Sequence, residues 1–284
     1  MNNLDDFIIE DGVLTQYKGN DEEIVIPDGV KIIGEGAFAC KKQITKVIIP
    51  DSVKHIDVTA FWACHRLTNI SMGKGVETIG KQAFALCSSL TEVIIGESVK
   101  HIEANVFYEC KNLQIVKIPE SVTQIDSGVF DLCESLTNIE VDDKNQYYSS
   151  INGNLYNKNK TTLIRYALGK KDTVFILPNS VRELEESVFS NCSNLERIVL
   201  HNGISALPRS AFFACVNLKE LEIPDSVTEI GDFVFWSCKN LEETSLSSNI
   251  KSIGENVFGY CNKLNIYADT GSYADEYCKE LFSK

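Results

Sequence analysis

The sequence lacks several features that would place it in a well-marked functional class. Its 27 basic residues are outnumbered by 40 acidic ones, which gives a net charge of −13. A nucleic-acid-binding surface needs a basic stripe that neutralises phosphates, and none is present, so we expect no nucleic-acid partner. No apolar run approaches the ~20 residues that span a bilayer, so we expect no membrane insertion.

Catalytic motifs and metal-ligand clusters are also missing. The chain contains no GxSxG, HExxH, GxxxxGKS/T or GxGxxG sequence. Two of its four histidines, His55 and His101, share a repeat position two rungs apart, and a separation of ~10 Å is too long for a shared metal ion. We therefore predict no catalytic residue, no metal site and no cofactor, with an enzyme such as a carbohydrate-degrading one as the remote alternative.

The N-terminus, MNNLDDFIIEDG, shows no basic region followed by an apolar stretch, so no secretion signal is visible. As written, the chain is expected to be cytoplasmic. If a signal was trimmed, the protein would instead belong at the cell surface or outside the cell.

What the sequence does contain is a unit of 23 residues that recurs along most of the chain. The copy VIIPDSVKHIDVTAFWACHRLTN, which begins at position 47, is followed at once by three others. Apolar columns keep the same phase, and the clearest is phenylalanine: Phe38, Phe61, Phe84, Phe107, Phe130, Phe189, Phe212, Phe235 and Phe258. One copy is too small to bury its own apolar side, so the copies must stack into a continuous core.

Cysteine forms a second column of the repeat. Its members are Cys64, Cys87, Cys110, Cys133, Cys192, Cys215, Cys238 and Cys261, while Cys40 stands one residue early. Free cysteine is a small and often buried apolar residue, so we interpret the column as a ladder of reduced thiols in the core. Neighbouring rungs are close enough for a disulfide, although parallel side-chain directions disfavour one. A reduced ladder fits the cytosol better than an oxidising compartment.

Each repeat also predicts a short strand. Ten triplets such as Ile24-Val25-Ile26 have outer positions that are nearly always apolar and a variable middle position. Because strand side chains alternate between faces, the outer pair is expected to point into the core and the middle residue outward. The segment before each phenylalanine is expected to form one helical or 3-10 turn on the convex side.

The ends and a central insert complete the predicted organisation of a single solenoid, residues 1–284. Asp11-Gly12 between alternating segments predicts a β-hairpin cap. Ser272, a candidate N-cap, precedes Tyr273, Tyr277 and Leu281 on one helical face, which predicts a C-terminal cap helix. The expected parts are a cap at 1–23, a first repeat array at 24–141, a hairpin insert at 142–177 with turns at 152–153 and 157–160, a second array at 178–264 and the cap helix at 265–284.

The unit I-P-x-S-V-x-x-I-G-x-x-x-F-x-x-C-x-x-L-x-x-V resembles the BspA-type leucine-rich repeat of bacterial surface antigens, a family also abundant in some protists. The hairpin insert and the TGSYADEY tail are similar to that family too, and the resemblance covers the chain from Phe7 to Leu281. It implies a right-handed leucine-rich repeat solenoid with a curved parallel sheet. It also implies protein binding, often as an adhesin, although no signal or anchor is visible here.

The outward strand positions are the candidate site for a protein partner, because the resemblance implies binding and several of these positions are apolar. β-propensity alone would also favour branched residues there. The candidates on the concave face are Val25, Ile48, Ile94, Ile115, Val174, Ile176, Val199, Glu220, Glu222 and Glu243. The convex aromatic residues Trp62, Tyr108, Phe213 and Trp236 are expected to lie flat over the neighbouring turn. The leading hypothesis is a non-catalytic interaction scaffold, and the alternative is a surface adhesin or antigen.

Overall fold

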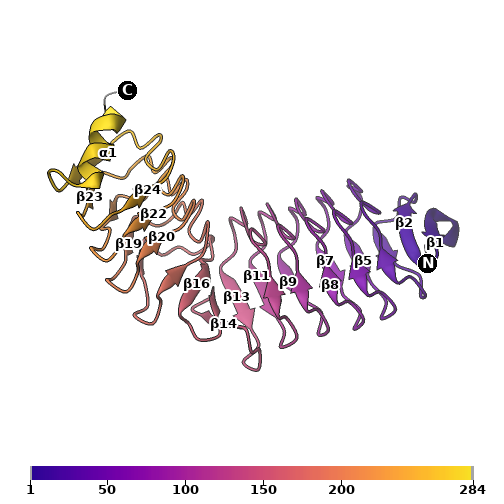
Figure 1. The fold of residues 1–284 in the computed structure, drawn as a ribbon. Helices are drawn as coiled ribbons and strands as arrows, with labels where there is room; N and C mark the ends of the chain where they lie inside the picture. The colour runs from indigo at the N-terminus through magenta and orange to yellow at the C-terminus, as the bar shows by residue number, and fades with distance from the viewer. Residues whose placement is uncertain (1, 283–284) are drawn as a thin grey trace. The chain divides into compact units, whose positions relative to one another are not determined.

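The structure, a computed structural model, describes residues 2–282. The chain forms two compact units, residues 1–153 and 154–284, and the division lies inside the predicted insert. In each unit the repeats form rungs whose strands lie side by side (Figure 1). The predicted β-rich repeat solenoid is confirmed.

The first unit contains two sets of rung strands. One set carries the predicted triplets: β3 (Glu23–Val25), β5 (Lys46–Ile48), β7 (Asn69–Ser71), β9 (Glu92–Ile94), β11 (Ile115–Ile118) and β13 (Asn138–Val141). These strands pair in parallel as β3-β5-β7 and β9-β11-β13. The other set is β4 (Ile32–Ile33), β6 (His55–Ile56), β8 (Thr78–Ile79), β10 (His101–Ile102) and β12 (Gln124–Ile125), which form one parallel ladder. The unit ends with β14 (Tyr148–Ile151).

The second unit repeats this plan. Its first set of strands is β17 (Val174–Ile176), β19 (Arg197–Val199), β21 (Glu220–Leu221), β23 (Glu243–Leu246) and β25 (Asn265–Ala268), which pair in that order. The second set is β18 (Glu183–Leu184), β20 (Ala206–Leu207), β22 (Glu229–Ile230) and β24 (Ser252–Ile253). Strand β25 follows Leu264, where the sequence repeat ends, and was not predicted.

The core lies between the strand sets and the phenylalanine column. The phenylalanine rings stack from rung to rung, with centroids 4.8 Å apart for Phe38 and Phe61 and 6.1 Å apart for Phe107 and Phe130. Phe107 and the valine, isoleucine and leucine of its rung are fully buried. Because each ring contacts the ring before and after it, the core exists only where neighbouring rungs are present.

The segments around each phenylalanine differ from the expected helical turns. They are successive hydrogen-bonded turns interrupted by left-handed residues, such as Thr59 with φ 53° and Ala63 with φ 57°. Such a residue costs roughly 1–2 kcal/mol in an L-amino acid. Here the turn aims the amide N–H groups of Thr59, Phe61 and Ala63 at carbonyl oxygens of the next rung, at 2.8–2.9 Å. These bonds between rungs offset the strain. Together with the two sets of strands, they give each rung a third side that is hydrogen-bonded to its neighbour.

Each unit begins with an antiparallel hairpin that contributes a tyrosine to the ring stack. After the 3-10 helix η1 (Leu4–Asp6), the strands β1 (Phe7–Glu10) and β2 (Val13–Tyr17) flank Asp11 and Gly12, both at positive φ, as the predicted turn requires. In the second unit β15 (Asn154–Asn157) pairs with β16 (Thr162–Arg165). The rings of Tyr17 and Tyr166 lie 5.3 Å from Phe38 and 5.5 Å from Phe189.

The predicted C-terminal helix is present as α1 (Tyr273–Phe282), and Ser272 is its N-cap. The Ser272 hydroxyl accepts a bond from the Asp275 N–H at 3.1 Å, while the Asp275 carboxylate accepts from the Gly271 N–H at 2.8 Å. The face that packs inward carries the buried Ala274 and Cys278. Of the predicted face of Tyr273, Tyr277 and Leu281, only Tyr277 packs inward, where its ring contacts Phe258. Tyr273 and Leu281 are exposed.

The cysteine ladder is unbridged and, apart from the half-buried Cys261, buried, and it has a hydrogen-bonding role. Seven of the eight ladder thiols donate to the carbonyl oxygen of the phenylalanine one rung earlier, at 2.9–3.3 Å: Cys64, Cys87, Cys110, Cys133, Cys215, Cys238 and Cys261. All ten cysteines are free. Cys40 lies outside the ladder, on an exposed turn at φ 61°, and Cys278 lies in α1.

We predict that Phe107→Ala lowers the free energy of unfolding by ~3–5 kcal/mol, because the cavity would lie between two stacked rings. Phe258→Ala should cost less, since Phe258 is slightly exposed and lies in the last rung. Urea unfolding of both variants measures the difference. Small and equal effects would contradict the stacked-core assignment.

We predict that one thiol, Cys40, reacts promptly with a thiol reagent in the folded protein. The buried ladder should react only after denaturation, when all ten thiols become accessible. The Cys40→Ser variant is the control and should abolish the prompt reaction. Fewer than ten thiols after denaturation without reductant would mean that disulfides had formed.

Stability should fall at alkaline pH. Burial raises the pKa of the Cys64 thiol from 9.0 to about 12 and that of Cys261 to about 11. Because the folded pKa is the higher one, the thiols' contribution is complete below pH 9 and decreases as the pH rises through 9 towards these values. Each thiol adds a slope of up to about 1.4 kcal/mol per pH unit. Urea unfolding between pH 7 and 11 tests this, and a Cys64→Ala variant should show a shallower slope.

Candidate functional site

All ten predicted contact residues lie on the outer face of the first set of strands. The alternation is clear on β3, where Ile24 and Ile26 are buried and Val25 between them is 52% exposed. Ile48, Ile115 and Val199 are half-buried, and the other members are exposed. The predicted strand phase is therefore confirmed, and the binding role of these residues stays a prediction.

In the first unit the apolar candidates lie in two separate places. Val25 lies opposite Ile48 in the register of β3 and β5. The next strand, β7, presents the polar Asn69 and Ser71 at the same outward positions.

Beyond β7, Ile94 lies opposite Lys117, and Ile115 lies opposite Glu92. Lys117 and Glu92 form an ion pair of 2.9 Å across these strands. The four apolar residues therefore do not form one continuous surface.

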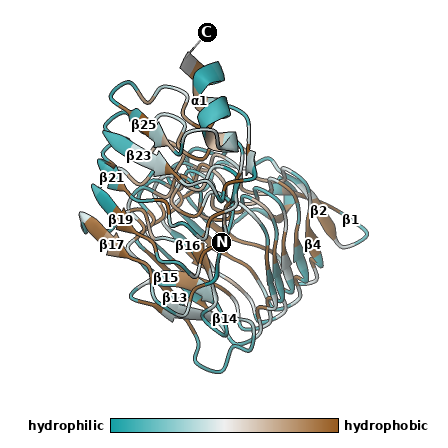
Figure 2. Ribbon diagram, turned by 60° about the vertical axis from the view of Figure 1, so that its left-hand side comes forward, coloured by the Kyte–Doolittle hydropathy of each residue, from teal (hydrophilic) through white to brown (hydrophobic). Residues whose placement is uncertain are grey.

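In the second unit the candidates do come together. Val174 and Ile176 project from β17 and are 48% and 69% exposed. Val199 of β19 lies directly opposite Ile176. We call Val174, Ile176 and Val199 the apolar group. It lies on the first two strands, β17 and β19, of the five-stranded sheet, whose strands are seen side by side in Figure 2.

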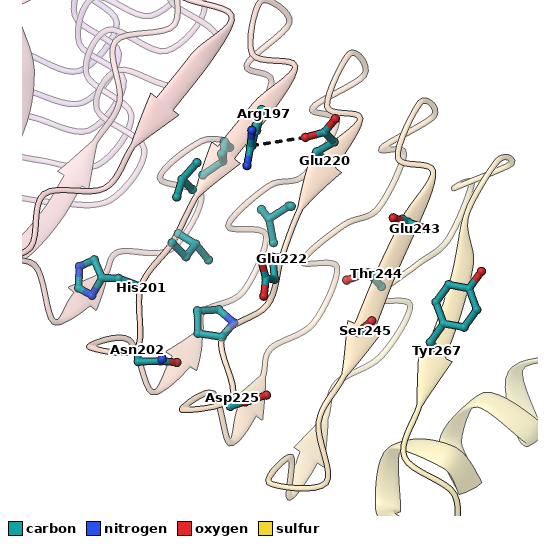
Figure 3. Close-up of a pocket in the computed structure, with 15 residues that line it drawn as sticks. Arg197, His201, Asn202, Glu220, Glu222, Asp225, Glu243, Thr244, Ser245 and Tyr267 are labelled. Atoms are coloured by element: carbon teal, nitrogen blue, oxygen red, sulfur yellow. Dashed lines mark ion pairs between the residues drawn. The ribbon is translucent and has the colours of Figure 1, made fainter.

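Beside the apolar group the sheet is hollowed and acidic. A shallow hollow of about 530 Å³ extends over β19, β21, β23 and β25. Figure 3 shows Arg197, Glu220 and Glu243 on consecutive strands, with an ion pair of 3.4 Å between Arg197 and Glu220. Glu222 follows Glu220 on the same face. We call Glu220, Glu222 and Glu243 the acidic group.

Sequence reasoning missed Tyr267, which closes the far end of the hollow. Tyr267 projects from β25, lies opposite Ser245 of β23 and is 57% exposed. The alternation of Asn265–Ala268 is a weak strand signal, but it falls outside the 23-residue register. The strand forms because β23 offers it an unpaired edge with four matching positions.

The histidines do not converge on any site. His101 Nε2 lies 3.0 Å from an oxygen of Asp126. His201 accepts a bond from the Gly203 N–H through Nδ1, at 3.0 Å, so its Nε2 carries the proton and donates to the Pro178 oxygen. Within residues 2–282 no group of three or more His, Cys, Asp or Glu side chains is arranged to hold a metal ion. Over the same residues no helix is long and apolar enough to cross a membrane.

Of the four aromatic residues expected on the convex side, Trp236 packs against the next rung. The ring of Trp236 lies over Gly259, where any side chain would collide with it. The same ring makes an edge contact with Tyr260, with centroids 4.7 Å apart. Trp62, Tyr108 and Phe213 are half-buried like Trp236. The expected packing over the neighbouring turn is confirmed for Trp236.

Comparisons with solved structures give bacterial leucine-rich repeat proteins. A protein from Eubacterium ventriosum is 27% identical, with a TM-score of 0.79 over 90% of this chain and 78% of its own. A leucine rich cell surface protein from Faecalibacterium prausnitzii is 26% identical, with a TM-score of 0.55 over 98% of this chain and 94% of its own. The pneumococcal vaccine antigen PcpA, at 22% identity, shares the fold with a TM-score of 0.66 over 91% of this chain and 81% of its own. No curated protein matches the chain.

The family comparison agrees with the repeat geometry. The BspA type leucine rich repeat region matches in six copies, over residues 9–137, 58–169 and 166–281. These ranges contain the stacked phenylalanines, the thiol ladder and both sets of strands described above. The chain therefore belongs to the BspA-type leucine-rich repeat family.

Proposed function

We propose that the chain is a non-catalytic interaction scaffold that binds a protein partner on the outer face of the β17–β25 sheet. The observation that carries the proposal is the apolar group, above all Ile176, which is 69% exposed although its strand neighbours are packed. An isolated sheet gains at most ~1 kcal/mol from a cross-strand pair of such side chains. A partner that covers them gains roughly 25 cal/mol per Å² of apolar area.

The first unit supports a second, smaller contact. Val25 and Ile48 lie opposite each other, and Ile94 is 56% exposed. Because polar residues separate these positions, they offer less continuous area than the apolar group. The second unit is therefore the main proposed site.

Two observations favour different locations for the scaffold. The ten free cysteines favour a reducing compartment such as the cytoplasm. The likeness to the Faecalibacterium cell surface protein favours the surface, and with it an adhesin or antigen role. Protease treatment of intact source cells separates the two, since only a surface protein would be degraded.

The test of the binding face is Ile176→Glu. We expect this variant to lose partner capture from a lysate of the source organism by at least tenfold, because burying an unpaired polar group costs ~1–3 kcal/mol and an ionised carboxylate costs more. The free energy of unfolding of the variant should differ from that of the wild type by less than ~0.5 kcal/mol, since Ile176 is outside the core.

The matched control is Leu4→Glu, which changes an equally exposed side chain, 69%, away from the strand face. It should keep full capture. Val25→Glu tests the contact in the first unit in the same assay. Normal capture by Ile176→Glu, together with loss in Val25→Glu, would move the site to the first unit.

A further inference from the structure

The outer face of the β17–β25 sheet changes character from one strand to the next. One row of outward residues crosses the rungs from Val174 through Arg197, Glu220 and Glu243 to Asn265. The second row begins with Ile176 opposite Val199, passes Glu222 and ends with Ser245 opposite Tyr267. Both rows therefore lead from an apolar end into an acidic middle, and the second ends on an exposed aromatic ring.

The acidic middle is poorly compensated within the protein. Glu220 lies directly opposite Glu243, and like charges at such positions destabilise a sheet. Arg197 pairs with Glu220 at 3.4 Å, but both side chains are more than half exposed, so the pair is weak and screened. Glu222 and Glu243 take part in no ion pair within residues 2–282. Two carboxylates thus remain available to cations from outside.

We propose that this hollow binds an extended basic segment of a polypeptide partner. An apolar side chain of the segment covers Ile176 and Val199, and its lysine or arginine side chains reach Glu222 and Glu243. This inference rests on the proposed function, whose site it extends from the apolar group to the acidic group. Charge complementarity identifies the partner, because an acidic partner would bring further like charge onto this face.

The spacing of the groups defines the segment. Rungs lie ~4.8 Å apart, so Ile176 and Glu222, two rungs apart, are separated by roughly 10 Å. About three residues of extended chain cover that distance. A polyamine would gain nothing from the apolar group. A divalent cation is disfavoured because the described carboxylates of this face do not converge into a metal-binding cluster.

The experiment is selection from a random 12-residue peptide library displayed on phage, with the full chain as the target. We expect the wild type to enrich peptides that carry two or more basic residues and an apolar residue about three positions away. One enriched peptide, which we call the winner, is then synthesised. It should bind the Glu222→Gln/Glu243→Gln variant about five- to tenfold more weakly than the wild type, because two exposed ion pairs are lost. It should bind Ile176→Glu more weakly as well.

The matched control is Glu229→Gln/Glu255→Gln, which removes two exposed carboxylates of the same unit outside the hollow. It should bind the winner as the wild type does. The Glu222→Gln/Glu243→Gln variant should also melt no lower than the wild type, because it removes like-charge repulsion, and this excludes misfolding as the cause of lost binding.

The outcomes separate this inference from the proposed function. Neutral or acidic winners that fail to bind Ile176→Glu would overturn the basic segment and leave the interaction face in place. Displacement of a winner by spermine at equal charge concentration would show recognition of charge alone, and it would overturn the inference. If no peptide is enriched on the wild type, the inference of a basic segment is overturned too. The proposed function is still decided by lysate capture with the Ile176→Glu variant.

Discussion

Every rung of this protein depends on the rung beside it. A single repeat leaves its phenylalanine, its thiol and three of its amide N–H groups without partners, and the neighbouring repeat satisfies all of them. The Phe61 ring stacks on Phe84 at 5.1 Å, the Phe61 N–H donates to Ala83, and the Cys87 thiol donates back to the Phe61 oxygen. Apolar burial drives the stacking, and the polar bonds allow irregular backbone to be buried with it.

Much of the fold could be predicted because each rung must match its neighbours, so the same residue types recur every 23 residues. The phenylalanine and cysteine columns, the inward and outward phase of the strands, the Asp11-Gly12 hairpin and the Ser272 cap all follow from residue type and spacing. The strands β4, β6, β8, β10 and β12 could not be predicted, since two-residue strands are too short for alternation to appear. The left-handed turns also have no signal. Residues as different as Thr59 and Leu86 adopt them, because bonds to the next rung, and not glycine, make them possible.

For the candidate site, the sequence identifies which residues face outward but not which of them meet. Val174, Ile176 and Val199 become one surface because β17 and β19 pair in register. Ile48 and Ile94 look equivalent in the sequence, yet β7 separates them with a serine. The hollow itself needed β25, whose Tyr267 falls outside the repeat. The residues of a binding face on a stacked protein are therefore predictable one at a time, whereas their continuity depends on every rung between them.

Tyr17 and Tyr166 give each unit its own first ring. Because each hairpin tyrosine takes the place that a preceding phenylalanine would occupy, neither stack needs an aromatic ring from the other to begin. The number of rungs in each unit is then free to change separately during evolution. Duplicating or deleting one whole 23-residue repeat that follows either tyrosine in the chain restores the same ring contacts, thiol bonds and strand register. A change of any other length would break all three, so the genetic unit of variation in this chain is the complete rung.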